Sequence, residues 1–409
     1  MGESTRFARG RGMLVALVVV SMLNVMGGAA VAPALPAISE AYPQASETVV
    51  SLVITLPSLA VALSGLFVGV LADRVGKART LVASLAVFTA AGLWGLVAPT
   101  LEALLAGRFV LGLAIAGIAT STGALVSEHY DEAMRAKVFG WQNAMTGASV
   151  LVLETGGGFL SLQGWRAPFW VYAVGFVMLV LAALFVREAR GRAEDSRLRE
   201  GADAAEGPAA SRRGPAGVAK AAGLVVGVCL AAALLSQALS YLVPAKMPYL
   251  VSSFGESSLM SGLFLGGFGA ANIIGPLAST RLQSRFRPSA IGAGCFASLS
   301  LGCALMAIAP TVWTVLAGAV LIGLGVGCLT PMLMALIASR STPENSGKHM
   351  GALATACNLG QFACTLLSGG VMALAGTHQA VFVAGALIGL ASAAASLAMR
   401  RRIDADGRL

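Results

Sequence analysis

The stretch GVLADRVGKARTL, residues 69–81, places one carboxylate and three cations in a chain that is otherwise almost wholly apolar. Its charged residues are Asp73, Arg74, Lys77 and Arg79, and two glycines, Gly69 and Gly76, lie among them. Of the 409 residues, 57% are hydrophobic and 11% are charged, whereas soluble domains carry about 25% charged residues. This composition predicts an integral membrane protein, with the charged stretch at the end of a membrane-spanning segment.

Twelve apolar runs, each close to the roughly 20 residues that cross a bilayer as a helix, follow one another along the chain. Apolar and polar residues do not alternate in them, as they would in the strands of a transmembrane barrel. The runs are 13–34, 49–71, 80–98, 101–126, 138–162, 166–186, 221–243, 257–279, 289–309, 312–338, 347–374 and 379–399. We therefore expect an all-α integral membrane fold with twelve transmembrane helices.

The positive charges are distributed unevenly between the two sides of these spans. All but three of the 28 lysines and arginines fall in the termini or in the even-numbered connections, the exceptions being Arg108, Arg166 and Lys246. Cytoplasmic loops carry such an excess. We therefore expect a bacterial-type inner (plasma) membrane protein with both termini in the cytoplasm. The net charge of +9 then reflects topology and contact with anionic lipid, and it does not indicate nucleic-acid binding.

A segment rich in charge, Ala, Gly and Pro separates the first six spans from the last six. It has no apolar stripe, which is typical of a solvated linker. We expect an N-terminal six-helix bundle at 1–186, a cytoplasmic linker at 187–217 and a C-terminal six-helix bundle at 218–409.

The two halves also resemble each other in sequence. GVLAD at 69–73 returns as GPLAS at 275–279, at the inner end of the second helix of each half. Prolines recur at the outer end of the first helix of each half, as Pro33 and Pro36 and then as Pro244 and Pro248. Parallel repeats of this kind mark one architecture of secondary transporters.

Residues 69–81 resemble the signature of the major facilitator superfamily, glycine-x-leucine-alanine-aspartate-arginine-x-glycine-basic. The match departs at Ala78, where the family usually has a second basic residue, and Arg79 follows it. A second family pattern fits LLAGRFVLGLAIA at 104–116, which supplies Leu104, Arg108 and Gly112. The chain thus resembles the bacterial twelve-helix efflux permease branch. The resemblance implies two pseudo-symmetric six-helix bundles that work by alternating access to a central cavity.

The charged stretch is predicted to be a conformational gate. Gly69 would let two helices approach closely, and Asp73 would face the positive amino end of a neighbouring helix. The resemblance implies that this neighbour is the eleventh span, so that the contact locks the outward-open state. The other gate residues are Arg74, Gly76, Lys77 and Arg79, whose cations would hold Asp73 and contact lipid headgroups. The alternative is that these cations only enforce topology.

Arg108 and Glu154 lie within spans, where ionisable residues are functional candidates. Each is some seven or eight residues from the outer end of its span, or roughly 11–12 Å deep. Burial in apolar surroundings favours a protonated carboxyl group, and a nearby guanidinium favours the ionised one. We predict that Glu154 is the proton-coupling site and Arg108 its modulator. A permanent structural ion pair between them is the alternative.

Glu154 also marks a departure from the family. Many drug–proton antiporters of the superfamily carry glycine-proline-x-x-glycine-glycine in the fifth span. Here Gly157 and Gly158 match the last two glycines, but Leu153 and Glu154 stand at the first two positions. The departure argues against the common drug-antiport mechanism and leaves export possible by another.

The resemblance implies that the first, fourth, seventh and tenth helices line the cavity. Their few polar side chains, with amides from other helices, favour an amphipathic organic molecule. The predicted substrate-binding residues are Asn24, Gln237, Tyr241, Lys246, Asn358 and Gln361. Lys246 could bind an anionic substrate or extend to the outer headgroups.

The sequence indicates neither an enzyme nor a primary pump, since it contains no Walker, HExxH or GxSxG motif. His129, His349 and His378 fall in loops or at span ends, where we expect them to be solvated and not to bind metal. No cofactor is expected. The expected partners are a small-molecule substrate, protons and the lipid bilayer, but no nucleic acid, and we expect a monomer.

Our first interpretation is a secondary active transporter that exports a small amphipathic or anionic compound in exchange for protons. The first alternative is a proton symporter that imports an organic anion, with Lys246 and Arg108 binding its carboxylate. The second alternative is a non-transporting membrane scaffold or sensor. An intact gate motif and a lone carboxyl group inside the spans weigh against the scaffold, which would need neither.

Overall fold

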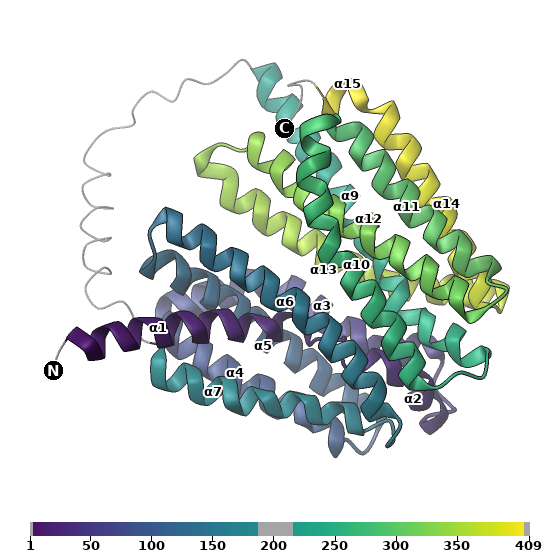
Figure 1. Cartoon of the computed structure of the whole chain (residues 1–409), viewed down its shortest axis with the longest axis horizontal. Helices are drawn as coiled ribbons and strands as arrows, with labels where there is room; N and C mark the ends of the chain where they lie inside the picture. Colours follow the sequence, from purple (N-terminus) through teal and green to yellow (C-terminus); the bar gives the residue numbers. More distant parts are fainter. Residues whose placement is uncertain (1–2, 187–215, 405–409) are drawn as a thin grey trace.

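The protein is described by a computed structural model that covers residues 3–186 and 216–404 (Figure 1). The predicted linker, 187–217, lies almost wholly outside the described residues. Its role as a boundary between two domains therefore stays a prediction.

The described residues are almost entirely helical and contain no strand. The N-terminal half runs through α1 (Glu3–Val20), η1 (Ser21–Val25), η2 (Ala32–Ala34), α2 (Leu35–Ala41), α3 (Glu47–Val75), α4 (Lys77–Leu93), η3 (Trp94–Leu96), α5 (Leu101–His129), α6 (Glu132–Ser161), η4 (Ala167–Ala173) and α7 (Val174–Phe185). The C-terminal half runs through α9 (Ala216–Ser253), α10 (Ser258–Arg285), α11 (Pro288–Ile308), α12 (Val312–Ser339), α13 (Pro343–Ala375), α14 (His378–Ala398) and α15 (Arg400–Ile403).

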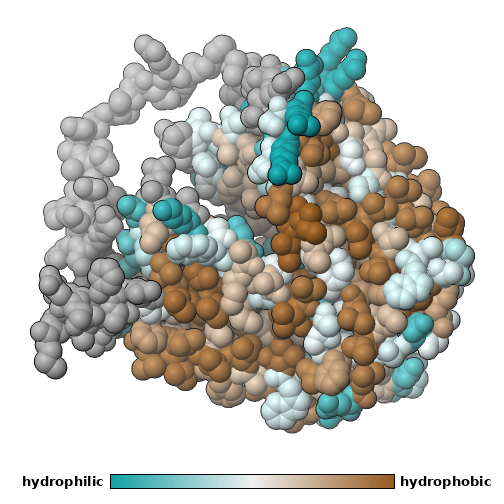
Figure 2. Space-filling model, viewed as in Figure 1, coloured by the Kyte–Doolittle hydropathy of each residue, from teal (hydrophilic) through white to brown (hydrophobic). Residues whose placement is uncertain are grey.

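These elements make up the twelve expected spans. Ten of them are long and apolar enough to cross a membrane by length and composition. The remaining two are the first span, which is broken into α1 and η1, and α6, which is 30 residues long but carries several charges. Figure 2 shows apolar residues over much of the visible surface, as expected of a protein that faces lipid.

Local sequence decides where the spans begin and end. Four helices start at a side chain that accepts a hydrogen bond from a backbone amide three residues on: Ser46 for α3, Thr100 for α5, Asp131 for α6 and Thr377 for α14. Gly76 and Gly376 end α3 and α13 with φ of 108° and 70°, which favour glycine. Such turns let long helices follow one another through the membrane with very short connections.

The two halves form separate bundles that meet along two seams, α3 against α13 and α6 against α10 (Figure 1). We call the end of the bundles that carries residues 42–46 and 376–377 the outer end, after the orientation expected from the sequence, and the opposite end the inner end.

The seam between α3 and α13 is closed at its outer part. The two helices run antiparallel, so Thr55 meets Thr365 with 2.8 Å between hydroxyl oxygens, and Ser58 Oγ donates to Gln361 Oε1 at 2.6 Å. Nearer the outer end, Gly369 packs directly on Thr48. These contacts hold the halves together from the outer end to the middle of the membrane.

The seam between α6 and α10 depends on glycine. A Cβ added at Gly158 would lie 2.7 Å from the carbonyl oxygen of Ser258 and 2.8 Å from Gly262 Cα. One turn further inward, Gly266 lies against the side chain of Thr155. Small residues allow this backbone approach in lipid, so the two bundles touch directly here.

Gly158→Ala is expected to lower the unfolding temperature of the purified protein, because the added methyl group collides with backbone atoms of α10. Overpacking of this kind costs about 1–3 kcal/mol. Gly156→Ala is the matched control, since a Cβ at Gly156 meets nothing within 4 Å. Thermal unfolding in detergent measures both, and equal unfolding temperatures would contradict the close crossing.

Candidate functional site

A central cavity lies between the two bundles at their inner end. Its volume is about 820 Å³, within the range of small-molecule sites. Residues of α3, α5, α9 and α13 line it, among them Gly65, Ala119, Thr120, Leu234, Lys348 and Asn358. Its lining is mostly apolar, and the exposed Lys348 brings a cation to it. Because the seams are closed at the outer end, the structure is inward-open if the expected orientation holds.

A chain of polar side chains crosses between the halves next to this cavity. Gln361 accepts from Ser58 Oγ at 2.6 Å and donates from Nε2 to Gln237 Oε1 at 3.3 Å. Tyr241 Oη lies close to Gly28 of the first span, within 3.2 Å of where a Cβ would stand. Three residues predicted to bind substrate, Gln237, Tyr241 and Gln361, are thus placed together. Sequence reasoning missed Ser58, since α3 is not among the helices expected to line the cavity.

The two predicted asparagines occupy different places. Asn358 lines the central cavity one helical turn from Gln361, and its Nδ2 donates to the Ala354 carbonyl at 2.9 Å. Asn24 is half-buried in η1, and its buried Oδ1 has no hydrogen-bond partner. An unpaired buried amide oxygen is available to a donor on a ligand.

Arg108 is almost fully buried, at 1% exposure, and its donors are used within the N-terminal half. Nε donates to the Val53 carbonyl at 2.7 Å, Nη1 to Tyr172 Oη at 2.7 Å and Nη2 to the Gly27 carbonyl. Tyr172 Oη in turn donates to the Met26 carbonyl at 2.7 Å. The first span leaves regular helix at these residues, so Arg108 and Tyr172 pair carbonyls that the break has freed.

Glu154 is also almost fully buried, at 3% exposure, but lies in the α6–α10 seam. Its Oε2 has no hydrogen-bond partner and approaches Gly269 of α10, where a Cβ would stand 3.1 Å away. No ion pair joins Glu154 to Arg108 among the described residues. The alternative of a permanent structural ion pair is therefore wrong for this conformation, because Arg108 is committed to backbone carbonyls.

Lys246 is placed differently from either sequence-based alternative. Its side chain is 0% exposed and its Nζ lies 3.7 Å from Glu47 Oε2 across the closed outer end. It does not extend to headgroups in this conformation, and a substrate anion would have to displace Glu47 to reach it. His378, expected to be solvated, is also mostly buried, 3.6 Å from Glu47. The contacts of Lys246 and His378 with Glu47 join segments that are far apart in the sequence, so no local sequence pattern could predict them.

The gate residues lie at the inner end, and no ion pair or hydrogen bond among the described residues joins them to α13. Asp73 has 73% of its side chain exposed and lies 4.0 Å from Lys77 Nζ, which also pairs with Glu128. A Cβ at Gly69 would meet nothing within 4 Å, so no close approach occurs there in this state. Arg74 and Arg79 are exposed. The predicted contact of Asp73 with α13 belongs to the outward-open state, so its absence from this conformation is consistent with that role. The contact itself stays a prediction.

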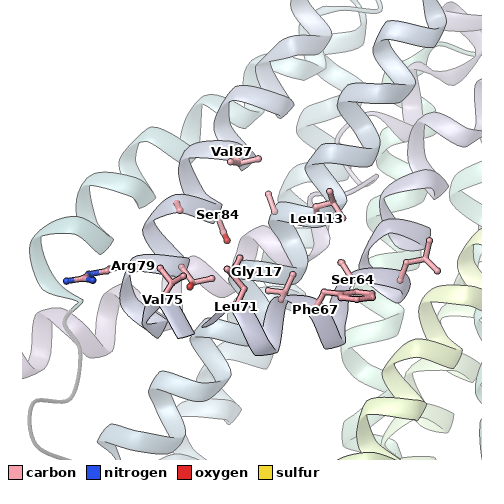
Figure 3. Close-up of a pocket in the computed structure, with 14 residues that line it drawn as sticks. Ser64, Phe67, Leu71, Val75, Arg79, Ser84, Val87, Leu113 and Gly117 are labelled. Carbon is pink, nitrogen blue, oxygen red and sulfur yellow. The ribbon is translucent and has the colours of Figure 1, made fainter. Parts of the chain in front are cut away.

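A second hollow, which we call the lateral groove, lies between α3, α4 and α5 (Figure 3). Its volume is about 620 Å³, and its lining includes Ser64, Phe67, Leu71, Ser84, Val87 and Leu113. Arg79 is at one end of the groove in Figure 3. The lining is almost wholly apolar, so the groove suits an apolar chain or ring. No sequence pattern indicates this groove, because it depends on how three helices diverge.

Two helical bundles that close one end and leave a solute-sized cavity at the other define a secondary transporter. The family comparison names the class more narrowly. The model of the Major Facilitator Superfamily matches residues 17–287 and 228–408, and the chain belongs to this superfamily.

Curated relatives are resistance proteins of bacteria. The chain is 30% identical over 305 residues to the class C tetracycline resistance protein of Escherichia coli, covering 71% of this chain and 72% of that protein. It is 29% identical over 126 residues to the multidrug resistance protein MdtL of Shigella dysenteriae serotype 1 (strain Sd197), covering 30% and 32%. Against the methylenomycin A resistance protein of Bacillus subtilis (strain 168) it is 32% identical over 127 residues, covering 30% and 27%.

Solved structures share the fold at low sequence identity. A POT family transporter in complex with 5-aminolevulinic acid superposes with a TM-score of 0.79 at 12% identity, over 97% of this chain and 96% of that chain. A D-xylose-proton symporter gives 0.75 at 14% identity, over 94% and 96%. At such identities the likeness concerns the fold alone, and it confirms the twelve-helix architecture expected from the sequence.

Arg108→Lys is expected to lower the unfolding temperature at every pH, because lysine cannot reproduce the planar fork that pairs several acceptors. Each buried carbonyl left unpaired costs about 1–3 kcal/mol. Arg285→Lys, at an exposed position, is the control. If thermal unfolding is unchanged while the pH profile of transport moves, Arg108 is the proton modulator expected from the sequence and not a backbone clamp.

Proposed function

We propose that this protein exports a small amphipathic or anionic organic compound across the bacterial inner membrane in exchange for protons. The observation that carries the proposal is Glu154, a buried carboxyl group with no hydrogen-bond partner, at the contact between the two moving halves. An ionisable group in that position favours one protonation state in the closed seam and the other in water.

The cavity supports an amphipathic compound. Its apolar lining would hold rings and chains, while Asn358 in the lining and the Gln361–Gln237 pair one helical turn away would orient the polar part. Lys348, exposed at the cavity, would attract an anionic group. The resistance proteins among the relatives support export over import, although their substrates are properties of those proteins.

The proton cycle follows from the two seams. In the present conformation the seams close the outer end, so Glu154 is sealed from the outside. Opening of the outer end would separate α6 from α10 and admit water and a proton to Glu154. The predicted gate, with Asp73 against α13, would then hold that outward-open state until the proton is bound.

The alternatives receive less support from the geometry. Import of an organic anion needs Lys246 and Arg108 as ligands, but Lys246 pairs with Glu47 and Arg108 with backbone carbonyls. A scaffold does not need a solute-sized cavity. Both termini in the cytoplasm and a monomeric state complete the proposal as expected from the sequence.

Glu154→Gln is expected to abolish compound-driven proton movement in proteoliposomes, because glutamine cannot take up and release a proton. Purified protein would be challenged with a panel of cationic drugs and organic anions while the internal pH is recorded. A compound that moves protons with the wild type and not with the variant identifies the substrate class.

Glu102→Gln is the control for that experiment, since Glu102 is an exposed carboxylate in the first turn of α5. It should couple as the wild type does. If Glu154→Gln also couples fully, Glu154 is structural and another group carries the proton. If no compound of the panel moves protons with the wild type while a labelled compound still crosses, proton coupling itself is wrong.

A further inference from the structure

Three ionisable side chains from three helices meet between the halves at the outer end. We call Glu47 of α3, Lys246 of α9 and His378 of α14 the outer triad. Glu47 Oε2 lies 3.7 Å from Lys246 Nζ, and Glu47 Oε1 lies 3.6 Å from His378 Nε2. Glu47 belongs to the N-terminal half and its two partners to the C-terminal half. The triad therefore exists only while the outer end is closed.

Tyr249 connects the outer triad to a second contact between the halves. Its ring stacks on His378 with centroids 5.6 Å apart, and Lys246 Nζ lies 5.5 Å from the same ring. Its hydroxyl is 2.8 Å from Ser39 Oγ on α2. Movement of His378 would thus disturb the Tyr249–Ser39 contact as well.

The triad holds one carboxylate for two bases. The other titratable groups in its surroundings are the Tyr249 hydroxyl and two thiols, with Cys364 of α13 near Lys246 and Cys303 of α11 near Cys364. Among the ion pairs of the described residues, Glu47 is the sole acid that reaches Lys246 or His378. With a neutral imidazole, the charges of Glu47 and Lys246 cancel. A protonated His378 would leave a net positive charge in a site where the side chains of Lys246, His378 and Glu47 are 0%, 19% and 31% exposed.

The hydrogen bonds also disfavour a protonated His378 in the closed conformation. His378 Nδ1 is buried and has no hydrogen-bond partner, so an imidazolium would bury an N–H group that has no acceptor. His378 also begins α14, whose positive amino end disfavours a further cation. Glu47 begins α3, where the same effect stabilises its carboxylate. The closed site accommodates a neutral histidine and a charged glutamate.

We propose that the outer triad is a second proton-binding site, separate from Glu154, at which a proton from the outside solution binds His378 and opens the outer end. Opening exposes the imidazolium, Lys246 and Glu47 to water, which removes the cost of the buried charge. Water reaches Glu154 only after the outer end has opened and both seams have parted there. Proton binding at His378 therefore precedes proton binding at Glu154. The inference rests on the proposed function only for the direction of the proton gradient.

The test is the distance between the two halves at the outer end as a function of pH. Spin labels would be attached at Gln44→Cys and Gln379→Cys, both exposed, in full-length protein whose six native cysteines are replaced by alanine, reconstituted in lipid nanodiscs. Lowering the pH from about 8 to 5, where histidine titrates, should increase the population with a long distance. One proton changes the population ratio by at most about tenfold per pH unit.

Variants of the triad separate protonation from structure. His378→Gln and His378→Phe should abolish the pH dependence, the second while keeping a ring against Tyr249. His378→Lys, which is charged throughout, and Glu47→Gln, which leaves Lys246 unpaired, should both be open at every pH. His349→Gln is the matched control, since His349 lies at the inner end, where it bonds Ser341.

Two results would overturn the proposal. One is a pH-dependent distance that persists in His378→Gln, and the other is closure of the outer end on acidification, which would mean that an imidazolium–Glu47 pair tightens the contact. Glu154→Gln distinguishes this inference from the proposed function. If that variant couples protons normally, the proposed proton-coupling role of Glu154 is wrong. The pH-dependent opening through His378 is tested separately, by the distance between the spin labels.

Discussion

Every backbone polar group in the hydrocarbon region must find a partner within the protein, and the first span cannot meet this requirement alone. Its helix breaks after η1, and Arg108 and Tyr172 pair the carbonyls of Gly27 and Met26. The same arginine binds Val53 of α3, so one side chain ties three spans together. The cavity, the seams and the outer closure all depend on the N-terminal bundle keeping this shape.

Closure of the outer end combines apolar packing with buried polarity. Glycines bring α6 and α10 into backbone contact, and short hydroxyl and amide bonds join α3 to α13. The two acids of mechanistic interest, Glu154 without a hydrogen-bond partner and Glu47 paired with Lys246, both lie at contacts between the halves. A group buried at such a contact is wetted when the halves part, so its protonation and the conformational change depend on each other.

Much of the fold could be read from the sequence, because span length, charge bias and glycine–proline positions are local properties. GVLADRVGKARTL and LLAGRFVLGLAIA were enough to predict the family. The sequence singled out Gln237, Tyr241 and Gln361 as polar residues of apolar helices, and their role in substrate binding stays a prediction. The role of Ser58, the burial of Lys246 and His378 and the lateral groove could not be predicted. They depend on how helices rotate and cross, and on which end is closed.

The α3–α13 seam has a consequence for how readily the protein changes state. Its hydrogen bonds, Thr55–Thr365 and Ser58–Gln361, are between neutral groups, and such bonds contribute only about 0.5–1.5 kcal/mol each. Inverting a two-state population from 1:99 to 99:1 requires about 5.5 kcal/mol. The two bonds together contribute less than that amount to the closed conformation. A small molecule in the cavity then changes which conformation prevails only by as much as it binds one conformation more tightly than the other.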